Sequence, residues 1–360
     1  MARERIISAD SLGLAEDQLN RSLRPTTLDE CIGTPQQFEK LRIALTAAKQ
    51  RSEPMEHVLL HGPPGLGKTT LAHVIANEMG TSIRVTSGPA LPRAGDLMGI
   101  LTNLERGDLL FIDEIHRLPI SVEEFLYPAI EEFKVDFTVD SGPHARTINI
   151  PLKPFTLIGA TTRAGLISAP LRSRFGIVEH LDYWSEEHLF QRVERSAAMM
   201  SLKYDEEALW VISRRARGTP RIANRLLRRV RDFAQVKSTG KLTIRSVEQA
   251  LELEGVDHLG LDSLDHKYLR TLLGTYNGGP AGVEAMAATL GEARDTLEDV
   301  VEPFLLRAGL LARTRQGRVA TRAAYSHLGL TPPAKPVTTL DGEEPTLFDG
   351  DETLNASGSE

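Results

Sequence analysis

The run of residues 62–69 constrains the fold of this chain more than any other segment. Its sequence, Gly-Pro-Pro-Gly-Leu-Gly-Lys-Thr, fits the phosphate-loop pattern G-x-x-x-x-G-K-[ST]. The run 57–61 before it is typical of a short buried strand, and residues 69–79 after it have helical periodicity. A helix that begins at such a loop turns its positive end toward a bound anion. We therefore predict a strand, a phosphate-binding loop and a helix.

The fixed positions of this loop suit a nucleotide with Mg²⁺. Glycines permit backbone conformations and close approaches that a side chain would block. The lysine of the pattern reaches the β- and γ-phosphates, and the hydroxyl after it ligates Mg²⁺. The predicted nucleotide-binding residues are Gly62, Gly65, Gly67, Lys68, Thr69 and Thr70, with Thr69 also a metal ligand. A glycine turn between two core elements is the structural alternative.

Charge and cysteine content narrow the class of protein. The net charge is −7, but residues 331–360 hold seven acids and one lysine, so the rest of the chain is nearly neutral. Rich in Pro, Gly, Ser and Thr, that segment is predicted to be a disordered acidic tail. The chain has no apolar run of the roughly 18 residues that span a membrane and no signal-peptide pattern at its start, so we expect a cytoplasmic protein. The single cysteine, Cys31, is expected to be a small apolar filler.

Composition divides the chain into three zones between an N-terminal arm, residues 1–19, and the tail, residues 331–360. Residues 20–182 alternate strand-like and helical runs, which favours a parallel sheet covered by helices. Residues 183–256 have helical patterns and predict a small all-helical lid domain. In residues 257–330, short helical patterns precede two strand-like runs around a polar turn, which indicates a winged helix. The predicted fold class is α/β, with a helical lid and a winged helix.

Two adjacent carboxylates follow the apolar run 109–112. Acids at the end of a buried strand cost desolvation energy unless a cation or a reaction uses them. In a phosphate-loop enzyme the first acid assists Mg²⁺, and the second polarises the attacking water. We therefore predict Asp113 as a metal ligand and Glu114 as the general base. Acids that cap a following turn are the alternative.

Three further polar side chains are candidates to act near the γ-phosphate. Thr162 follows the apolar run 155–160 and is assigned to orient the water, although threonine also has ordinary β-propensity. Arg174 is the candidate finger that stabilises charge in a neighbouring subunit's site, with a plain surface arginine as the alternative. Arg221 lies in the first turn of a helix, where a cation opposes the helix dipole unless an anion binds.

Five segments together resemble the AAA+ ATPases of the RuvB family, the motors that drive branch migration of Holliday junctions. They are GPPGLGKTT, LLFIDEIHRL, IGATTRAG, APLRSRFGI and RGTPRIANRLLRRVRDFA, and the likeness runs from about residue 20 to residue 332. It implies an ATPase that uses ATP and Mg²⁺, forms a homohexameric ring and acts on double-stranded DNA with RuvA, and with RuvC in the junction-resolving complex. The rival interpretations are a clamp-loader-like or protein-remodelling ATPase and a nucleotide-gated DNA-binding regulator.

The resemblance also assigns residues around the adenine base. It implies that Leu23, Arg24 and Trp184 enclose the base. The chain departs from the family pattern at residues 31–34, where Cys-Ile-Gly-Thr replaces aromatic-Ile-Gly-Gln. It departs again at residues 314–318, where one arginine is shifted by a position.

Residues 133–151 contain two alternating apolar runs joined by Asp-Ser-Gly-Pro at residues 140–143, the pattern of an inserted hairpin. The resemblance implies that this hairpin docks on RuvA, which makes Ile148 and Ile150 the predicted partner contacts. Completion of the core by these side chains is the equal alternative.

Arginines gather near the predicted wing. No acid lies between residues 303 and 330, a stretch that includes Arg313, Arg315, Arg318 and Arg322. Such arginines bind phosphates without reading sequence. The resemblance singles out Arg313 and Arg318 and adds Arg294, so the predicted DNA contacts are Arg294, Arg313, Arg315 and Arg318. Solvated surface charge is the alternative.

Overall fold

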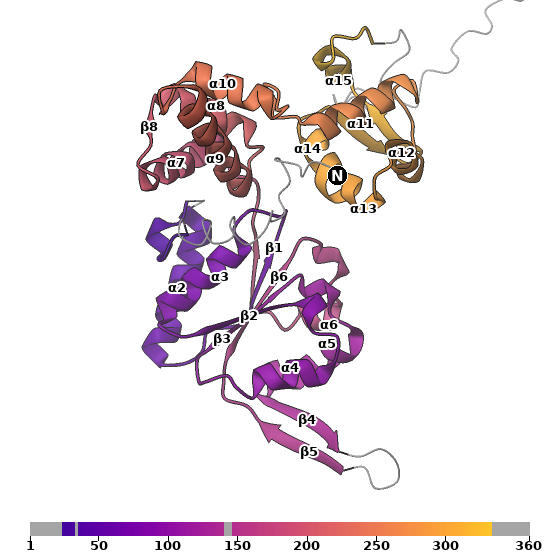
Figure 1. The fold of residues 1–360 in the computed structure, drawn as a ribbon. Helices are drawn as coiled ribbons and strands as arrows, with labels where there is room; N and C mark the ends of the chain where they lie inside the picture. The colour runs from indigo at the N-terminus through magenta and orange to yellow at the C-terminus, as the bar shows by residue number, and fades with distance from the viewer. Residues whose placement is uncertain (1–23, 33–34, 140–145, 333–360) are drawn as a thin grey trace, which may run out of the picture. The chain divides into compact units, whose positions relative to one another are not determined.

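The computed structural model describes residues 24–32, 35–139 and 146–332 (Figure 1). They fall into two compact units, divided between Asp262 and Ser263. The predicted adenine contact Leu23, the N-terminal arm and nearly all of the tail lie outside the described residues. Among the residues that are described, no helix is long and apolar enough to cross a membrane.

The first unit is built on a parallel sheet of five strands in the order β2-β3-β6-β1-β7. The strands are β1 (Val58–His61), β2 (Ile83–Ser87), β3 (Leu109–Asp113), β6 (Thr156–Thr161) and β7 (Ile177–His180). In the central register, Val58 of β1 is opposite Ile158 of β6 and Ile177 of β7. All five strands run in one direction, so their carboxyl ends form a single edge.

Helices cover both faces of this sheet, as predicted. On β1, Val58 and Leu60 belong to the core beneath α2 and α3, whereas Leu59 between them belongs to the core beneath α4, α5 and α6. Figure 1 shows the two helix layers on opposite sides of the strands. The helices are α2 (Pro35–Arg51), α3 (Lys68–Met79), α4 (Ala94–Leu101), α5 (Ile120–Glu131) and α6 (Ala169–Arg172). Strands buried on both faces explain the continuous apolar runs of the sequence.

Short 3₁₀ turns connect several of these elements. They are η1 (Leu28–Glu30), η2 (Gly88–Ala90), η3 (Ile115–Arg117) and η4 (Ala164–Leu166).

The predicted hairpin is present as an antiparallel pair outside the main sheet. Its strands are β4 (Lys134–Val139) and β5 (Arg146–Pro151), with Val135 opposite Ile150. Val135 is fully buried in the core beneath α5, so the base of the hairpin is anchored, and its far end projects from the domain (Figure 1). The predicted turn at residues 140–143 lies outside the described residues.

The lid portion of the first unit packs four helices around one apolar core. They are α7 (Glu186–Met199), α8 (Glu206–Arg215), α9 (Pro220–Lys237) and α10 (Ile244–Leu253). The all-helical prediction was incomplete, because β8 (Lys203–Tyr204) and β9 (Lys241–Leu242) form a small parallel ladder. Strands of two residues are too short to show an alternating pattern. Their pairing is supported by the backbone bond from Asp205 N to Leu242 O and by the ion pair of Lys241 with Asp205.

The second unit is a winged helix, as predicted. Helical segments precede an antiparallel wing, in which Leu311 is opposite Ala320. The elements are α11 (Ser263–Gly274), α12 (Val283–Leu290), α13 (Arg294–Thr296), the π-helical turn η5 (Leu297–Val301), α14 (Glu302–Arg307), β10 (Leu311–Thr314), β11 (Gly317–Ala320) and α15 (Arg322–His327).

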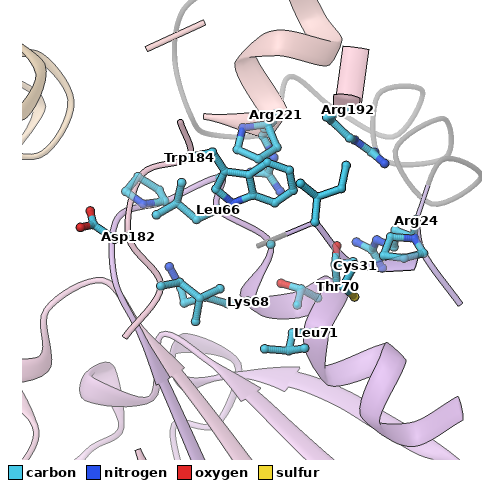
Figure 2. A pocket seen from close by; sticks show the side chains of 18 of the residues that line it. Arg24, Cys31, Leu66, Lys68, Thr70, Leu71, Asp182, Trp184, Arg192 and Arg221 are labelled. Carbon is cyan, nitrogen blue, oxygen red and sulfur yellow. The ribbon is translucent and has the colours of Figure 1, made fainter. Parts of the chain in front are cut away.

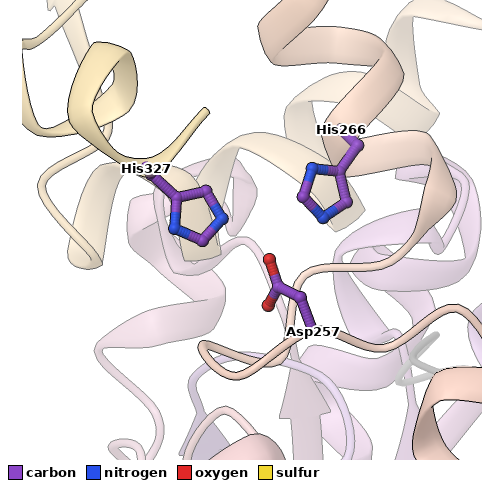
Figure 3. Close-up of side chains that lie close together, drawn as sticks. All are labelled: Asp257, His266 and His327. Atoms are coloured by element: carbon purple, nitrogen blue, oxygen red, sulfur yellow. The ribbon is translucent and has the colours of Figure 1, made fainter. Parts of the chain in front are cut away.

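The final helix, α15, was not predicted, because six residues are too few for a clear periodicity. Thr321 caps it by accepting a hydrogen bond from Ala324 N, and Tyr325 is buried. His327 of α15 stacks on His266 of α11, with ring centroids 5.7 Å apart (Figure 3). The capped and stacked helix therefore completes the core of this unit.

Gly62 provides a test of how the phosphate loop is fixed to the sheet. It has φ +142°, and a Cβ at this position would lie 2.0 Å from the carbonyl oxygen of Leu181. We predict that Gly62→Ala lowers the free energy of unfolding by about 3 kcal/mol, through backbone strain and overpacking. The matched control is Gly99→Ala at an exposed position of α4, where a Cβ would have no atom within 4 Å; this variant should gain about 0.5 to 1 kcal/mol. Urea unfolding would contradict this if Gly62→Ala were as stable as wild type.

Candidate functional site

The phosphate loop joins β1 to α3 at the carboxyl edge of the sheet. Its glycines have positive φ, with 142° at Gly62, 77° at Gly65 and 97° at Gly67, which other residues rarely adopt. α3 begins at Lys68, so its unpaired N–H groups lie at the loop. The loop borders a cavity of about 380 Å³, seen in Figure 2. This volume is within the range of small-molecule sites.

Lys68 brings a buried positive charge to this cavity. The side chain is 7% exposed, and Nζ donates hydrogen bonds to the carbonyl oxygens of Gly62 at 2.8 Å and Pro63 at 3.0 Å. Burial lowers the pKa of Lys68, and the nearby carboxylates of Asp113 and Glu114 oppose this shift. Phosphate oxygens would supply the strong anionic partner that the loop carbonyls do not. The loop therefore fits a phosphate-bearing ligand.

The predicted acids lie at the same cavity. β3 ends at Asp113, whose Oδ1 accepts a hydrogen bond from Glu114 N at 3.0 Å. Glu114 then has φ 49°, a left-handed conformation that turns the chain sharply into η3. Its Oε2 accepts a hydrogen bond from Thr162 Oγ1 at 3.2 Å, so the structure brings together the candidate base and the candidate water-orienting residue. With the hydroxyl of Thr69, Asp113 supplies the hard oxygen donors that suit Mg²⁺.

Three other predicted residues border the cavity, namely Arg24, Trp184 and Arg221 (Figure 2). The backbone N–H of Trp184 donates to Gly218 O at 2.9 Å, which ties the main chain at Trp184 to the segment just before α9. Arg221, in the first turn of α9, is near enough to contribute to the lowered pKa of Lys68. The lid therefore brings a second cation to the phosphate side of the cavity.

Sequence reasoning missed several residues that line the cavity. They are Ile32, Phe38, His188, Arg192 and Asn224, and Cys31 joins them. Burial lowers the pKa of Arg192 to about 10 and raises that of Cys31 to about 11. The thiol therefore stays protonated at neutral pH and acts as a small apolar side chain, as predicted. No motif marks Arg192, because its place in α7 resembles any helical surface position.

Arg174 does not line this cavity. Its Nη1 donates to Pro170 O at 2.5 Å, its Nε lies 3.1 Å from Glu131, and its guanidinium lies 4.1 Å from the ring centre of Tyr127. Arg174 therefore does not bring its guanidinium to the nucleotide cavity of its own chain. Its role as a finger in trans stays a prediction.

Three family models match consecutive parts of the chain. They are the Holliday junction DNA helicase RuvB P-loop domain over residues 23–181, the RuvB AAA lid domain over 184–257 and the RuvB C-terminal winged helix domain over 258–329. The chain belongs to the RuvB family.

Individual RuvB proteins are similar along almost the whole chain. The Holliday junction branch migration complex subunit RuvB of Desulfosudis oleivorans is 60% identical over 309 residues, which cover 86% of this chain and 90% of that protein. The subunit of the same name from Kosmotoga olearia is 55% identical, covering 91% and 95%. The solved structure of the Thermotoga maritima RuvB Holliday junction branch migration motor has a TM-score of 0.79 at 51% identity, covering 86% and 99%.

In this RuvB-family chain, the two predicted hairpin contacts differ in exposure. Ile148 is 50% exposed on β5, whereas Ile150 packs partly against the core beneath α5. The core-filling alternative therefore applies to Ile150, and Ile148 is the side chain that a partner could reach.

Acids neutralise most of the predicted DNA-binding arginines. The stretch 303–330 has no acid, but η5 and α14 place Glu298 and Glu302 against the wing. Arg313 Nη2 lies 2.6 Å from Glu302, and Arg318 pairs with Glu302 at 3.0 Å and Glu298 at 2.8 Å. Arg294 is paired with Glu298 and Glu284. The expected unopposed positive patch is therefore corrected, because Glu298 and Glu302, which lie just before the acid-free stretch, pack beside the wing.

Glu302 is the centre of this cluster. Its side chain is fully buried, and Oε1 also accepts a hydrogen bond from Tyr268 at 3.0 Å. Burial and the neighbouring Glu302 raise the pKa of Tyr268, so the phenol remains a donor. Arg318 is only 14% exposed, whereas Arg315 at the wing turn is exposed and has no ion pair among the described residues. Arg315 is therefore the most available of the four predicted phosphate contacts.

Removing the carboxylate of Glu302 tests this division of roles. We predict that Glu302→Ala destabilises the winged unit by about 3 kcal/mol, because Arg318 and Tyr268 lose their buried partner. Arg315→Ala is the control and should leave thermal unfolding unchanged, yet reduce the salt slope of duplex DNA binding by about 1. Equal thermal stability of Glu302→Ala and wild type would refute the structural role of the cluster.

Proposed function

We propose that this RuvB-family chain is an ATP-dependent motor that drives branch migration of Holliday junctions in homologous recombination and DNA repair. One observation carries the hydrolytic part: Lys68, Asp113, Glu114 and Thr162 border a single cavity, although they come from three separate segments. The family match, which extends from the phosphate loop through the winged helix, supports the motor part. The names of the similar proteins point to the junction as the substrate.

The chemistry follows from where the side chains lie. Lys68 and Arg221 would bind phosphate oxygens of ATP, and Trp184 and Arg24 lie where the base would be enclosed. Glu114 would take a proton from the attacking water. Thr162 would orient both the carboxylate of Glu114 and that water. Mg²⁺, held by Thr69 and Asp113, would supply positive charge opposite the phosphate oxygens.

The position of Arg174 supports a ring assembly. If Arg174 acts as a finger, its guanidinium reaches a neighbouring subunit's nucleotide, and a closed ring, as in a homohexamer, gives every cavity a finger. In this proposal residues 20–182 form the ATPase domain, 183–256 the lid and 257–330 the DNA-binding domain, in a cytoplasmic protein. Hydrolysis changes the angle between the ATPase domain and the lid, and the winged domain transmits that motion to double-stranded DNA.

The two rival functions have less support. A clamp-loader-like ATPase would share the phosphate loop and the acids, but its third domain would be expected to match a different family of domains. Residues 258–329 instead match the RuvB C-terminal winged helix domain. A nucleotide-gated regulator needs no general base, yet Glu114 is presented to the cavity with Thr162 bound to it.

Mixing two inactive variants tests the ring and the finger. Arg174→Ala should bind ATP but hydrolyse it about 10³-fold more slowly, because transition-state charge in the neighbouring site is uncompensated. Lys68→Ala loses its own site but keeps its finger, so mixed rings should regain ATPase activity and some ATP-driven movement of a synthetic four-way junction with RuvA. Mixed rings, verified by co-purification of two tags, that regain no activity would exclude the finger role. Wild-type rings that hydrolyse ATP without moving the junction would exclude the motor.

The hairpin is the proposed docking site for RuvA, with RuvC joining the complex at the junction. Ile148 supports this, because half of a large apolar side chain is exposed on a strand that projects from the domain. Arg315, with the partly exposed Arg313 and Arg294, would contact DNA phosphates.

Substitution on the hairpin separates partner binding from folding. Ile148→Asp should weaken RuvA binding about tenfold or more, because a charge replaces an apolar contact, and should leave basal ATPase activity intact. Ile148→Leu, which keeps an apolar side chain at the same exposed position, is the control. Isothermal titration with RuvA would argue against this docking site if both variants bound as tightly as wild type.

A further inference from the structure

We propose that His116 is a positioning residue for the hydrolytic reaction, which holds Glu114 so that one carboxylate oxygen remains available for water. This inference depends on the proposed role of Glu114 as general base. His116 lies in η3, the turn directly after β3, and its side chain is 8% exposed. It does not line the nucleotide cavity, so it acts through Glu114 and not on the substrate.

The two oxygens of Glu114 have different surroundings. Nδ1 of His116 lies 3.2 Å from Oε2, and Thr162 Oγ1 donates to the same Oε2 at 3.2 Å. Oε1 receives no hydrogen bond from any residue that the structure describes. Two contacts on one oxygen orient the carboxylate and leave the lone pairs of the other for the proton of the attacking water.

The imidazole is itself held in place. Its Nδ1 lies 2.9 Å from Thr161 Oγ1, and that oxygen accepts a hydrogen bond from Arg163 N at 3.0 Å. Thr161 is fully buried at the end of β6, so its hydroxyl cannot move away. Donation to Glu114 requires the proton on Nδ1, and the tautomer with an unprotonated Nδ1 would instead accept from Thr161.

The backbone around Glu114 adds to this rigidity. Arg117 N donates to Glu114 O at 2.9 Å, which closes the turn that presents His116. A Cβ on Gly88 would lie 2.5 Å from the same carbonyl oxygen, so η2 packs directly against this turn. A flexible glutamate side chain is thus fixed by a rigid turn on one side and by Thr162, which follows β6, on the other.

Two amide variants separate positioning from general packing. The amide nitrogen of asparagine can take the place of Nδ1, whereas that of glutamine extends toward the place of Nε2. We expect His116→Gln to lower kcat for ATP about tenfold or more, with KM changed less than about twofold, because a misdirected base affects the reaction and not binding. His116→Asn should stay within about threefold of the wild-type kcat.

The assay uses the full chain with ATP and Mg²⁺, and thermal unfolding verifies that each variant folds. Should His116→Gln not fold, His116→Ala takes its place in the comparison. Equal kcat values for the asparagine and glutamine variants would overturn the inference, as would a glutamine variant at the wild-type rate.

A double variant separates this inference from the proposed function on which it rests. In Glu114→Gln, the added change His116→Gln should lower the residual rate by less than about twofold, because the group that His116 positions is already lost. A further loss of about tenfold in the rate of the double variant would show that His116 acts independently of Glu114, and would overturn the inference. Wild-type activity in the single variant Glu114→Gln would be a different result. It would contradict the proposed role of Glu114 as general base.

Discussion

The candidate site depends on the parallel pairing of β3, β6 and β1 in that order. This arrangement brings the acids after β3, the threonines after β6 and the phosphate loop after β1 to one edge of the sheet. Glu114 and Thr162 are 48 residues apart in sequence, yet they meet at 3.2 Å. The strands are apolar on both faces because helices cover both, so polar groups are confined to the strand ends. The cavity at this edge is therefore a consequence of how the core is built.

The two units deal with buried charge in different ways. In the first unit, Lys68 donates hydrogen bonds to two neutral carbonyl oxygens of its own loop, and burial lowers its pKa. A site of this kind gains stability when an anion arrives. In the second unit, Glu302 is already matched by Arg313, Arg318 and Tyr268. Such a cluster holds the wing in place. The arginines buried in it are structural, and the exposed arginines remain available to bind DNA phosphates.

Particular residues show how far sequence reasoning reached. The phosphate loop, the acids after β3 and the hairpin were predictable, because each has a short pattern with a direct physical cause. The ladder of β8 and β9 and the helix α15 were not, since elements of two and six residues carry no periodicity. Arg192 has the appearance of a surface residue on α7 and is buried at the cavity only because the lid packs against the segment around Cys31.

The sequence by itself determined the chemical types present: a loop of glycines before Lys68, paired acids at a strand end and basic residues in a wing. Those properties are local, because they depend on the conformations and charges of neighbouring residues. Only the tertiary structure decided which groups meet. It placed His116 and Thr162 on the same oxygen of Glu114, and it matched Arg313 and Arg318 of the wing with Glu298 and Glu302. The physical reason is that burial and hydrogen-bond partners depend on packing between distant segments, which no local pattern encodes.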